Sequence, residues 1–519
     1  MSASPTDPPR DSRVQPDAAA RPATGSGADP EIVRTKIVAT VGPASRGEEA
    51  LCGLVAAGVD VFRLNMAHGS PAEHEETLGR IRAVSREAGR PVGVLVDLAG
   101  PKIRLGDLPG GTVECVEGTR IRLVRGAGPS TAEAFTVTYD RLVDELAKGD
   151  PVILADGSVA LEVEERQPDA LVCRVVQGGS VRSRQGVNLP GVRLSIAAMT
   201  AADWRHAEWA AGAGVDFVSL SFVRSADEVR LLKELLRARG SAARVVAKIE
   251  KPEAVAAMDA VCAAADVVMV ARGDLGVEID VAEMPIVQKR IIRTCQRFQK
   301  PVIVATQMLE SMQHSRRPTR AEATDVANAI LDGADACMLS GETAIGAHPK
   351  AAVRMMRRIA RATESQYLAD RRVSIEERQR APWLSAAAEA AQPESLPEGL
   401  HPITQAVVDG AGRIAADVGA RLVVVASHTG ATAIARSKRR GAVPTVGVSD
   451  CEATLRQMAL YWGVTPLGGT VSNDVEALLA HVTAWGLAAG RLAAGDRVVL
   501  VSGFGFGTGG HNMALVREV

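Results

Sequence analysis

The sequence predicts an α/β protein: a closed (β/α)8 barrel with a small β-barrel domain inserted into it and a further α/β domain after it. Three observations lead to this fold class. Eight short, β-branched apolar runs recur along the chain, and each ends on polar residues. Helix-like segments separate most of them, and such alternation is typical of a parallel sheet covered on both faces. Eight units close a barrel, and no strand is followed by the Gly-x-Gly-x-x-Gly turn typical of the alternative, an open doubly wound sheet.

The expected barrel strands follow one another in chain order. They are the runs KIVATVGP, VDVFRLNMAHG, PVGVLVDLAG, VDFVSLSFVR, RVVAKIEKP, DVVMVARGDLG, PVIVATQMLE and ADACMLSGET. Segments such as SADEVRLLKELLRARG and AEMPIVQKRIIRTCQRFQ have the pattern of the covering helices. The third strand ends near Asp97 and the fourth begins near Asp216, and short strand-like runs such as TRIRLVRG and SVALEVEER fill the gap. Gly, Pro and Asp punctuate these runs, which predicts a small antiparallel barrel inserted there.

The chain therefore divides into a tail and three folded units. The expected segments are a disordered tail at 1–31, the catalytic barrel at 32–100 and 188–368, the inserted lid domain at 101–187, a connector at 369–400 and an α/β regulatory domain at 401–519. The tail is rich in Pro, Ala and Asp and has no apolar core, so it is a poor signal peptide. Its acidic residues argue against a transit peptide as well.

Composition excludes several classes of protein. The 519 residues are 46% hydrophobic and 23% charged, with a formal net charge of −1, so nothing points to a nucleic-acid or membrane partner. No apolar stretch is long and charge-free enough to span a bilayer. The seven cysteines form no Cys-x-x-Cys pair, which favours buried thiols in a reducing cytoplasm over disulfides or a zinc site.

Polar side chains stand at the carboxyl end of every expected barrel strand. They are Thr40, Arg63, Asn65, Asp97, Ser219, Ser221, Lys248, Glu250, Arg272, Asp274, Thr306, Ser340 and Glu342. In a barrel of this kind the carboxyl ends of the strands carry the chemistry. A single one of these residues would be explained as well by a buried ion pair or a helix cap. Eight strands out of eight ending this way indicate a site.

The chemistry expected there is phosphoryl transfer. Glu250 and Asp274 end adjacent strands, and two carboxylates leave most of the coordination shell of Mg²⁺ open for water and phosphate oxygens. Lys248 lies on the same strand face as Glu250, and a structural Lys–Glu pair is an equally good explanation of these two residues alone. Arg63 adds a guanidinium that matches phosphate, and Gly273 lets the backbone approach a ligand.

Taken in order, the motifs resemble those of the pyruvate kinase family. They are TKIVATVGPAS, FRLNMAHG, DLAGPKIR, GVNLPG, AKIEKPEAV, VMVARGDLGVEI, ATQMLESM and PTRAEATDVANAILDGADACMLSGETAIGAHP. They run from Thr35 to about Pro349, with the inserted domain in the family's place, and the C-terminal unit resembles the family's third domain. The resemblance implies transfer of the phosphoryl group of phosphoenolpyruvate to ADP, giving pyruvate and ATP in glycolysis. It also implies a Mg²⁺ cofactor, with Mn²⁺ as a substitute, and a homotetramer.

The resemblance implies roles for residues at the barrel mouth. Lys248 would neutralise charge on the phosphoryl group and the enolate, while Glu250 and Asp274 would hold the metal. Gly273, Asp274 and Thr306 would bind phosphoenolpyruvate, with Arg63 on its phosphate. Thr306 would also lie on the route that protonates the enol carbon. The remaining implied roles are a proton-supplying network of Ser340 and Glu342, and nucleotide binding by Asn65, His68 and Arg104.

The chain departs from the family pattern in three places. Ala67 stands where the family usually has a hydroxyl, and Leu98 and Ala99 stand where threonine and lysine are common. Gln185, after Arg184, stands where lysine commonly precedes GVNLPG. These changes bear on the monovalent-cation site and on one contact to the nucleotide phosphates, and leave the core chemistry in place.

Lys102 suggests that the enzyme does not require K⁺. Many pyruvate kinases have glutamate at this position and use K⁺, whereas others carry lysine and work without it. An ammonium group near Asp97 and the substrate phosphate would replace the bound ion, at a site that Asn65 would otherwise help to form. Ala67 fits this reading because the hydroxyl that would help to hold K⁺ is missing. The alternative is that Lys102 is a solvated turn residue.

A second ligand site is expected in the C-terminal domain. The run VVVASHTGATAIA passes from a strand through Ser427, Thr429, Gly430 and Thr432 into a helix, and a hydroxyl-rich loop at a helix N-terminus suits a phosphate group. Helix capping by Thr429 or Thr432 explains the hydroxyls equally well. The match to the family's effector loop favours a sugar phosphate or a nucleoside monophosphate.

Two other functions compete with catalysis by a pyruvate kinase. One is a catalytically weak, pyruvate-kinase-like regulatory protein, and the other is a different barrel that uses an enolpyruvate, such as a lyase or an aldolase. The retained Lys248, Glu250, Asp274 and Thr306 argue against the first, because a regulatory scaffold needs none of them.

Overall fold

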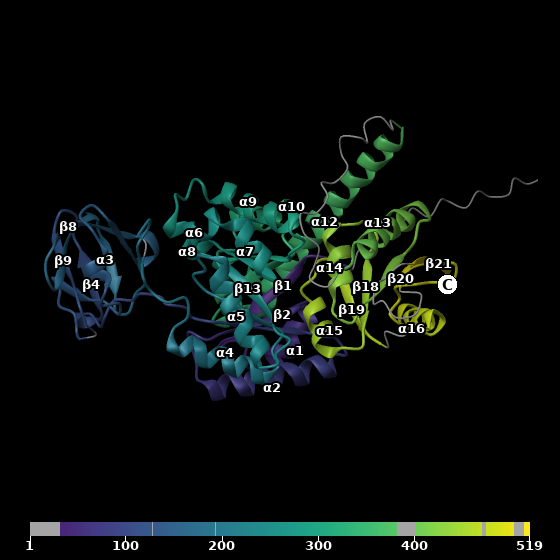
Figure 1. Ribbon diagram of the computed structural model, residues 1–519, viewed down its shortest axis with the longest axis horizontal. Helices are drawn as coiled ribbons and strands as arrows, with labels where there is room; N and C mark the ends of the chain where they lie inside the picture. Colours follow the sequence, from purple (N-terminus) through teal and green to yellow (C-terminus); the bar gives the residue numbers. More distant parts are fainter. Residues whose placement is uncertain (1–31, 127, 193, 381–399, 470–473, 503–512) are drawn as a thin grey trace, which may run out of the picture.

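The computed structural model describes residues 32–126, 128–192, 194–380, 400–469, 474–502 and 513–519. The predicted tail at 1–31 and residues 381–399 of the predicted connector lie outside these ranges. The described chain forms three units in a row, with the inserted domain and the C-terminal domain on opposite sides of a central barrel (Figure 1).

The central unit is a closed barrel of eight parallel strands, as predicted. Its strands are β1 (Lys36–Thr40), β2 (Val61–Asn65), β3 (Gly93–Asp97), β12 (Phe217–Leu220), β13 (Arg244–Ile249), β14 (Val267–Ala271), β15 (Val302–Ala305) and β16 (Ala336–Leu339). The strands pair in chain order around the barrel, and β16 closes it against β1. Each expected apolar run contains one of these strands, and nearly all of their residues are buried because the strands are covered on both faces.

Helices surround the barrel on the outside. They are α1 (Glu48–Ala57), α2 (Pro71–Glu87), α4 (Ala201–Ala213), α5 (Ala226–Ala238), α6 (Pro252–Ala256), α7 (Met258–Ala264), α8 (Arg272–Glu278), α9 (Met284–Arg297), η3 (Glu310–Gln313), α10 (Arg320–Asp332), α11 (Gly341–Ala344) and α12 (Pro349–Arg380). The two segments expected to be helical contain α5 and α9. α12 continues to Arg380, so the first part of the predicted connector extends this helix (Figure 1).

The inserted domain follows β3 and is built mainly of antiparallel strands. Its elements are η1 (Pro109–Gly111), β4 (Thr112–Cys115), β5 (Arg120–Val124), β6 (Ala134–Thr136), α3 (Leu142–Glu145), β7 (Pro151–Leu154), η2 (Ala155–Gly157), β8 (Val159–Arg166), β9 (Ala170–Gln177), β10 (Gly179–Arg182) and β11 (Val187–Asn188). Six strands form a sheet in the order β11-β7-β8-β9-β5-β6, and β10 pairs with β4. Alternating apolar residues on these strands build a separate core.

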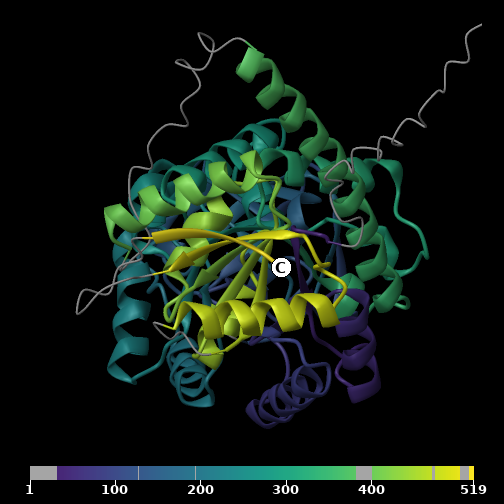
Figure 2. The same ribbon diagram turned by 90° about the vertical axis from the view of Figure 1, so that its right-hand side faces the viewer.

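The C-terminal domain is a five-stranded sheet with helices on both faces (Figure 2). Its elements are α13 (Pro402–Asp417), β17 (Leu422–Ala426), α14 (Ala431–Lys438), β18 (Thr445–Ser449), α15 (Glu452–Met458), β19 (Val464–Gly468), α16 (Val475–Ala488), β20 (Arg497–Ser502) and β21 (Met513–Glu518). The strand order is β19-β18-β17-β20-β21, and only β21 runs antiparallel to its neighbour among these described strands.

Aspartates stand immediately before four alternate barrel strands, at the end of the barrel that faces the C-terminal domain. Each accepts a hydrogen bond from a backbone N–H at the start of the neighbouring strand: Asp60 from Ile37, Asp216 from Val94, Asp266 from Val245 and Asp335 from Val302. All four donor–acceptor distances are 2.8–2.9 Å. These carboxylates therefore satisfy backbone donors that the strand ends would otherwise leave unpaired.

Cations of the C-terminal domain complete two of these sites. Lys438, the last residue of α14, and Arg440, just after it, bind Asp335 at 2.7 and 2.9 Å, and Arg456 of α15 binds Asp216 at 2.7 Å. Burial lowers the pKa of the Lys438 ammonium, because the attraction of Asp335 offsets only part of the loss of solvent. The contact between the two domains is therefore made in part by buried ion pairs.

All seven cysteines lie within the described residues and are unbridged, as predicted. Within the same ranges, none of the helices has the length and apolar character needed to cross a lipid bilayer.

Candidate active site

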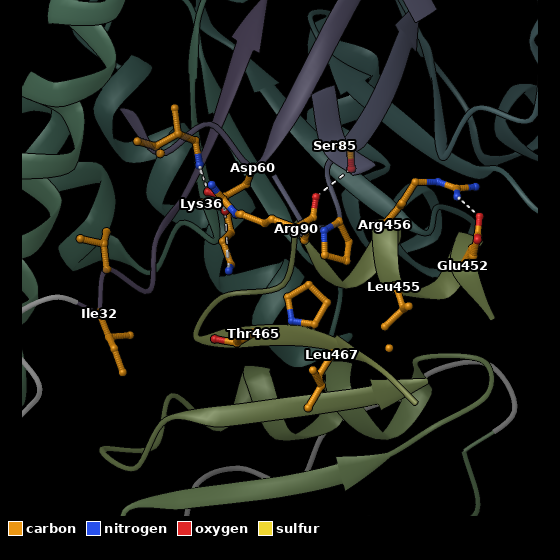
Figure 3. A pocket seen from close by; sticks show the side chains of 18 of the residues that line it. Ile32, Lys36, Asp60, Ser85, Arg90, Glu452, Leu455, Arg456, Thr465 and Leu467 are labelled. Carbon is orange, nitrogen blue, oxygen red and sulfur yellow. Dashed lines mark hydrogen bonds and ion pairs between the residues drawn. The ribbon is translucent and has the colours of Figure 1, made fainter. Parts of the chain in front are cut away.

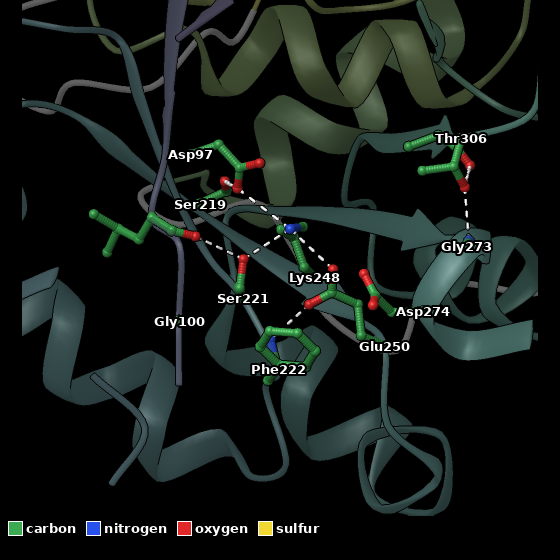
Figure 4. Close-up of polar contacts among 12 residues, drawn as sticks. Asp97, Gly100, Ser219, Ser221, Phe222, Lys248, Glu250, Gly273, Asp274 and Thr306 are labelled. Carbon is green, nitrogen blue, oxygen red and sulfur yellow. Dashed lines mark hydrogen bonds and ion pairs between the residues drawn. The ribbon is translucent and has the colours of Figure 1, made fainter. Parts of the chain in front are cut away.

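Lys248 lies at the centre of a polar cluster at the carboxyl end of the barrel (Figure 4). Its Nζ is 2.9 Å from Glu250 Oε1, 3.4 Å from Asp97 Oδ1 and 2.7 Å from Ser221 Oγ. Burial would lower the pKa of this ammonium, but Asp97 and Glu250 outweigh burial and raise the pKa above its usual value. Lys248 is therefore a fixed positive charge at neutral pH, and its place beside Glu250 is as expected from the strand period.

Asp97 is the second centre of the cluster. It accepts a hydrogen bond from Arg63 Nε at 2.8 Å and another from Ser219 Oγ, while Arg63 also reaches Thr40 Oγ1 at 3.0 Å. Burial would raise the pKa of Asp97, but Lys248 and Arg63 outweigh it and hold the pKa below its usual range. Because Asp97 is charged and saturated with donors, it orients the two cations rather than accepting a proton.

Glu250 and Asp274 present the carboxylates suited to a divalent metal. Glu250 Oε2 accepts a hydrogen bond from the backbone N–H of Phe222 at 2.7 Å, which fixes the carboxylate beside Asp274 (Figure 4). Burial raises the pKa of Glu250; Lys248 offsets part of this rise, and the charge of Asp274 adds to it. Within the described residues no third His, Cys, Asp or Glu joins these two in a metal-binding group. A metal held here would need further ligands from water or substrate.

Thr306 is held in an unusual backbone conformation next to these carboxylates. Its φ is 66°, a left-handed value that costs energy for a β-branched residue and that clusters at functional sites. Thr306 Oγ1 accepts a hydrogen bond from Gly273 N at 2.8 Å, and Arg272 donates to the carbonyl oxygen of Thr306 at 2.7 Å. Arg272, expected among the polar residues of the mouth, also pairs with Asp325. Its contacts therefore help to hold the backbone of Thr306 in place.

Ser340 and Glu342 follow the last barrel strand. Glu342 accepts hydrogen bonds from the backbone N–H of Leu309 at 3.0 Å and of Ser340 at 2.7 Å, and burial raises its pKa. Ser340 Oγ is buried and has no hydrogen-bond partner among the described residues. A buried hydroxyl without a partner can serve as a donor to water or substrate that enters the mouth.

Lys102 lies against a different carboxylate from the one expected. Its Nζ is 2.8 Å from Asp274 Oδ1, whereas Asp97 is paired with Arg63 and Lys248. The pairing follows from the path of the chain, because Gly100 turns at a φ of 70° and carries Lys102 away from the end of β3. Lys102 thus places its charge beside Asp274, one of the two carboxylates expected to hold a metal.

The residues expected to face a nucleotide lie on two elements that the described contacts do not join. Asn65 and His68 belong to the turn after β2, where Asn65 Oδ1 accepts a hydrogen bond from Ala67 N at 3.2 Å. Arg104 lies on the entry to the inserted domain and donates to the carbonyl oxygen of Arg184 at 3.1 Å. These side chains therefore stand on the barrel and on the inserted domain, respectively.

The expected effector loop lies in the C-terminal domain, between β17 and α14. Ser427 Oγ accepts a hydrogen bond from Gly430 N at 3.0 Å, and Gly430 is the N-cap residue of α14 with a φ of 81°. Thr429 Oγ1 accepts a long hydrogen bond, of 3.5 Å, from the backbone N–H of Ala431, the first residue of α14. Helix capping by these hydroxyls therefore stays an alternative to an anion site. The carbonyl oxygen of Thr429 accepts a hydrogen bond from Arg244, the first residue of β13, at 2.8 Å.

A cavity of about 740 Å³ lies between the barrel and the C-terminal domain, at the opposite end from the lysine cluster (Figure 3). Lys36, Asp60, Arg90 and Arg456 line it, and they belong to the ion pairs that begin the barrel strands. The cavity is therefore separate from the cluster around Lys248, and its charged residues already have partners that cap the barrel strands.

Fold and site together define the class of protein. A closed parallel barrel that gathers a permanently charged lysine, an arginine and two metal-type carboxylates at its carboxyl end is suited to phosphoryl transfer, in which positioning and charge stabilisation dominate catalysis.

Comparison with known proteins gives the family. The model of the pyruvate kinase barrel domain matches residues 32–353, and that of the pyruvate kinase alpha/beta domain matches residues 405–517. A pyruvate kinase of Mycobacterium tuberculosis (strain ATCC 25618 / H37Rv) is 40% identical over 94% of this chain and 98% of its own length. One from Geobacillus stearothermophilus is 38% identical over 94% of this chain and 80% of its own length. The chain belongs to the pyruvate kinase family and is a phosphotransferase of that family's kind.

A solved structure agrees with this assignment. The crystal structure of a pyruvate kinase from Cryptosporidium parvum has a TM-score of 0.84 and 32% sequence identity, covering 93% of this chain and 96% of its own. The resemblance inferred from the motifs is thus confirmed, and the alternative, a catalytically weak regulatory protein, is not favoured.

Proposed function

We propose that the enzyme transfers the phosphoryl group of phosphoenolpyruvate to ADP, and that the cluster around Lys248 does the chemistry. The observation that supports this most directly is the Lys248 ammonium, held within 3.4 Å of both Asp97 and Glu250. An ammonium in that position stabilises negative charge that grows on the phosphoryl group and then on the enolate of pyruvate. Arg63, oriented by Asp97, binds the substrate phosphate with its remaining donors.

Glu250 and Asp274 are proposed to hold Mg²⁺. The donor set fits, because both carboxylates are hard oxygen ligands that follow the adjacent strands β13 and β14 and leave room for water and phosphate oxygens. Mn²⁺ prefers the same donors and is expected to substitute. When bound, the metal neutralises charge on the phosphate and carboxylate oxygens of the substrate. Gly273 and Thr306 border this site and are proposed to bind phosphoenolpyruvate through backbone and hydroxyl donors.

Protonation of the enol carbon is assigned to the other side of the mouth. Thr306, Ser340 and Glu342 supply hydroxyls and a buried carboxyl group, and burial raises the pKa of Glu342, so this carboxyl holds its proton more readily than an exposed glutamate does. We place Asn65, His68 and Arg104 on the nucleotide. Binding then requires the inserted domain to approach the barrel as a lid, since Arg104 stands on that domain.

We further propose that the enzyme does not need K⁺. Lys102 carries a fixed charge 2.8 Å from Asp274, and Ala67 lacks the hydroxyl that would help Asn65 and Asp97 to hold a monovalent ion. Near-full activity is expected in buffer with a bulky organic cation in place of K⁺ and Na⁺. Lys102→Glu should be poorly active even with K⁺, and adding Ala67→Ser should partly restore a K⁺-dependent rate. Strong activation of the unmodified enzyme by K⁺ would refute this part.

The loop at Ser427, Thr429, Gly430 and Thr432 is proposed to bind the phosphate of a sugar phosphate or a nucleoside monophosphate. Its support is the position of the loop directly before α14, where the hydroxyls of Ser427 and Thr429 lie beside the first backbone N–H groups of the helix. A panel of both ligand classes, titrated while the phosphoenolpyruvate saturation curve is followed, tests the proposal. If no member shifts the curve, the loop has a structural role only.

Two further properties are proposed from the family. Assembly into a homotetramer is supported by exposed apolar side chains on contacting helices, Ile286 of α9 and Leu331 of α10, which are 67% and 51% exposed in one chain. A cytoplasmic location fits a glycolytic enzyme. Molar mass from light scattering tests the first of these and cell fractionation the second.

The central proposal is tested by coupling turnover to lactate dehydrogenase with phosphoenolpyruvate, ADP and Mg²⁺. Stoichiometric pyruvate and ATP support it. Pyruvate without ATP would point to another enolpyruvate-using barrel, and no turnover by folded protein would point to a regulatory relative.

A further inference from the structure

A buried contact joins the inserted domain to the barrel where the chain returns from the insertion. Glu278 Oε1 accepts a hydrogen bond from Lys251 Nζ at 2.7 Å and one from Asn188 Nδ2 at 3.4 Å. The Glu278 side chain is only 1% exposed and that of Lys251 15%. One buried carboxylate thus serves two donors from different parts of the chain.

The three side chains come from functionally distinct places. Asn188 ends β11, the edge strand by which the inserted sheet joins the barrel, and it lies opposite Ile153 of β7. Glu278 is the last residue of α8, one helical turn after Asp274. Lys251 directly follows Glu250 in the chain. The contact therefore ties the returning strand of the inserted domain to both loops that carry the proposed metal ligands.

The two bonds to Glu278 differ in what their loss would cost. A buried carboxylate must keep a charged partner, and Lys251 provides one at short range whatever Asn188 does. The bond from Asn188 is long, so it can break without leaving Glu278 uncompensated. The Lys251–Glu278 ion pair is therefore suited to a permanent role in the structure. The hydrogen bond from the side-chain amide of Asn188 is suited to form and break as the inserted domain moves.

We propose that Asn188 and Glu278 form a latch that sets the orientation of the inserted domain over the barrel mouth. In this role they are positioning residues and do not touch the reacting atoms. The inference rests on the proposed function, because it assumes that the inserted domain brings Arg104 to the nucleotide. The latch is closed when the hydrogen bond between Asn188 and Glu278 is formed. The inserted domain is then held beside Glu250 and Asp274, in the orientation that brings Arg104 to the nucleotide.

Substitution of Asn188 tests the latch. Asn188→Ala should raise the KM for ADP by about 3- to 30-fold, as for loss of one hydrogen bond to a charged group, and leave the KM for phosphoenolpyruvate within about twofold. Asn188→Asp should raise the KM for ADP further, because it sets a second carboxylate against Glu278. Thermal unfolding of Asn188→Ala should stay close to that of the unmodified enzyme, whereas Asn188→Asp should unfold at a lower temperature because it buries a second carboxylate.

Hydrogen exchange gives a readout that does not depend on turnover. The backbone N–H of Val187 donates to the carbonyl oxygen of Ile103 at 2.9 Å, which closes the two chain segments that join the insertion to the barrel. Opening of the latch should therefore speed amide exchange in peptides that cover 185–192, and leave peptides of β17 unchanged. Failure of the proposed function would appear as no turnover by the unmodified enzyme, whereas failure of the latch would appear as unchanged exchange in both Asn188 variants.

A pair of variants separates positioning from simple loss of charge. Lys251→Met leaves Glu278 buried without its cation and should disturb both stability and the KM for ADP. Lys251→Met combined with Glu278→Gln removes both charges but keeps an oxygen that accepts from Asn188, so the KM for ADP should recover towards the original value. No recovery in the double variant would overturn the latch.

Lys233→Met is the matched control. Lys233 pairs with Asp266 at 2.7 Å, and their side chains are 14% and 11% exposed, so the ion pair resembles Lys251–Glu278 but lies on the far end of the barrel. Its loss should lower the unfolding temperature without changing the ratio of the two KM values. A rise in the KM for ADP as large as that of Asn188→Ala would show that general destabilisation, rather than the latch, accounts for the effect.

Discussion

The two ends of the barrel use the same residue types in opposite ways. At the end facing the C-terminal domain, aspartates such as Asp335 accept both a backbone N–H and two cations, Lys438 and Arg440. At the mouth, Lys248 lies between two carboxylates: Asp97, whose described partners are side chains, and Glu250, which also accepts a hydrogen bond from the backbone N–H of Phe222. The first arrangement completes strand ends with fixed partners. In the second arrangement, charged side chains lie together, and a substrate and a metal can take the place of their present partners.

This difference shows which buried charges are available for chemistry. A carboxylate that satisfies a strand N–H cannot change its partner without loss of a backbone hydrogen bond. A lysine between two carboxylates can turn towards a third acceptor at small cost, because the neighbouring arginine keeps Asp97 neutralised. A choice of two carboxylate partners, rather than burial, therefore distinguishes the proposed catalytic lysine from the structural Lys438.

The largest effect is expected from Lys248→Met. The variant should lose about three orders of magnitude in kcat, ~4 kcal/mol of transition-state stabilisation, since the positive charge at the reacting group disappears. Single-turnover and steady-state kinetics measure it, with unfolding followed in parallel. Lys438→Met, which removes a buried lysine at the other end, should leave kcat nearly unchanged while the protein is folded. Near-original turnover by folded Lys248→Met would refute the assignment.

The opposite pattern is expected for Asp335→Asn. Lys438 and Arg440 would keep their burial and lose their carboxylate, which should destabilise the folded state by ~3 kcal/mol. Urea unfolding measures this, and kcat at low temperature should stay within about twofold. Asp417→Asn, an exposed position at the end of α13, serves as the control and should change little. The comparison of the two barrel ends would be contradicted if folded Asp335→Asn lost most of its kcat while its free energy of unfolding hardly changed.

A smaller effect separates two glycines. A Cβ at Gly273 would meet Thr306 at ordinary contact distances of 3.6 Å, whereas one at Gly42 would lie 2.6 Å from the carbonyl oxygen of Ala344. Gly273→Ala should therefore fold normally and raise the KM for phosphoenolpyruvate about tenfold by crowding the substrate. Gly42→Ala should instead lower the unfolding temperature. If Gly273→Ala binds phosphoenolpyruvate normally, no ligand approaches that backbone.

The smallest effect concerns pH. The pKa of Asp97 is lowered in the folded state, so its contribution to stability is present above the unfolded carboxyl pKa of about 3.9 and is lost as pH falls through the folded value. The stability gap between the unmodified enzyme and Asp97→Asn should be constant from about pH 6 to 8 and shrink in strong acid. Urea unfolding at a series of pH values tests this, and a gap that widened in acid would contradict it.

Much of the mouth was predictable because strand ends obey a simple rule. A run of buried residues that stops at a charged residue marks the edge of the sheet, and parallel strands bring those edges together, so the neighbours of Lys248 followed from the sequence. The partner of Lys102 could not be predicted from the sequence. It depends on the turn at Gly100 and on where the inserted domain stands, and neither is written in a local pattern.

The aspartates at the other end were missed although they carried a signal. Asp60, Asp216, Asp266 and Asp335 each stand one residue before a strand, in VDVFRLN, VDFVSL, ADVVMV and ADACML. A carboxylate immediately before alternate strands indicates a backbone cap. Arg272 shows the converse limit, because its position at a strand end placed it among the polar residues of the mouth, whereas its contacts support the backbone of Thr306.

The insertion also has a consequence for how the chain assembles. β3 and β12 are neighbours, with Asp97 level with Ser219, although the whole inserted domain separates them along the chain. Closing so long a loop costs conformational entropy, but the insertion has its own core and its ends are joined by the bond from Val187 to Ile103. We expect the insertion to fold first and so to shorten the loop that remains. The fourth barrel strand can then dock beside the third almost as a local event, and the slow step of folding moves to closure of β16 against β1.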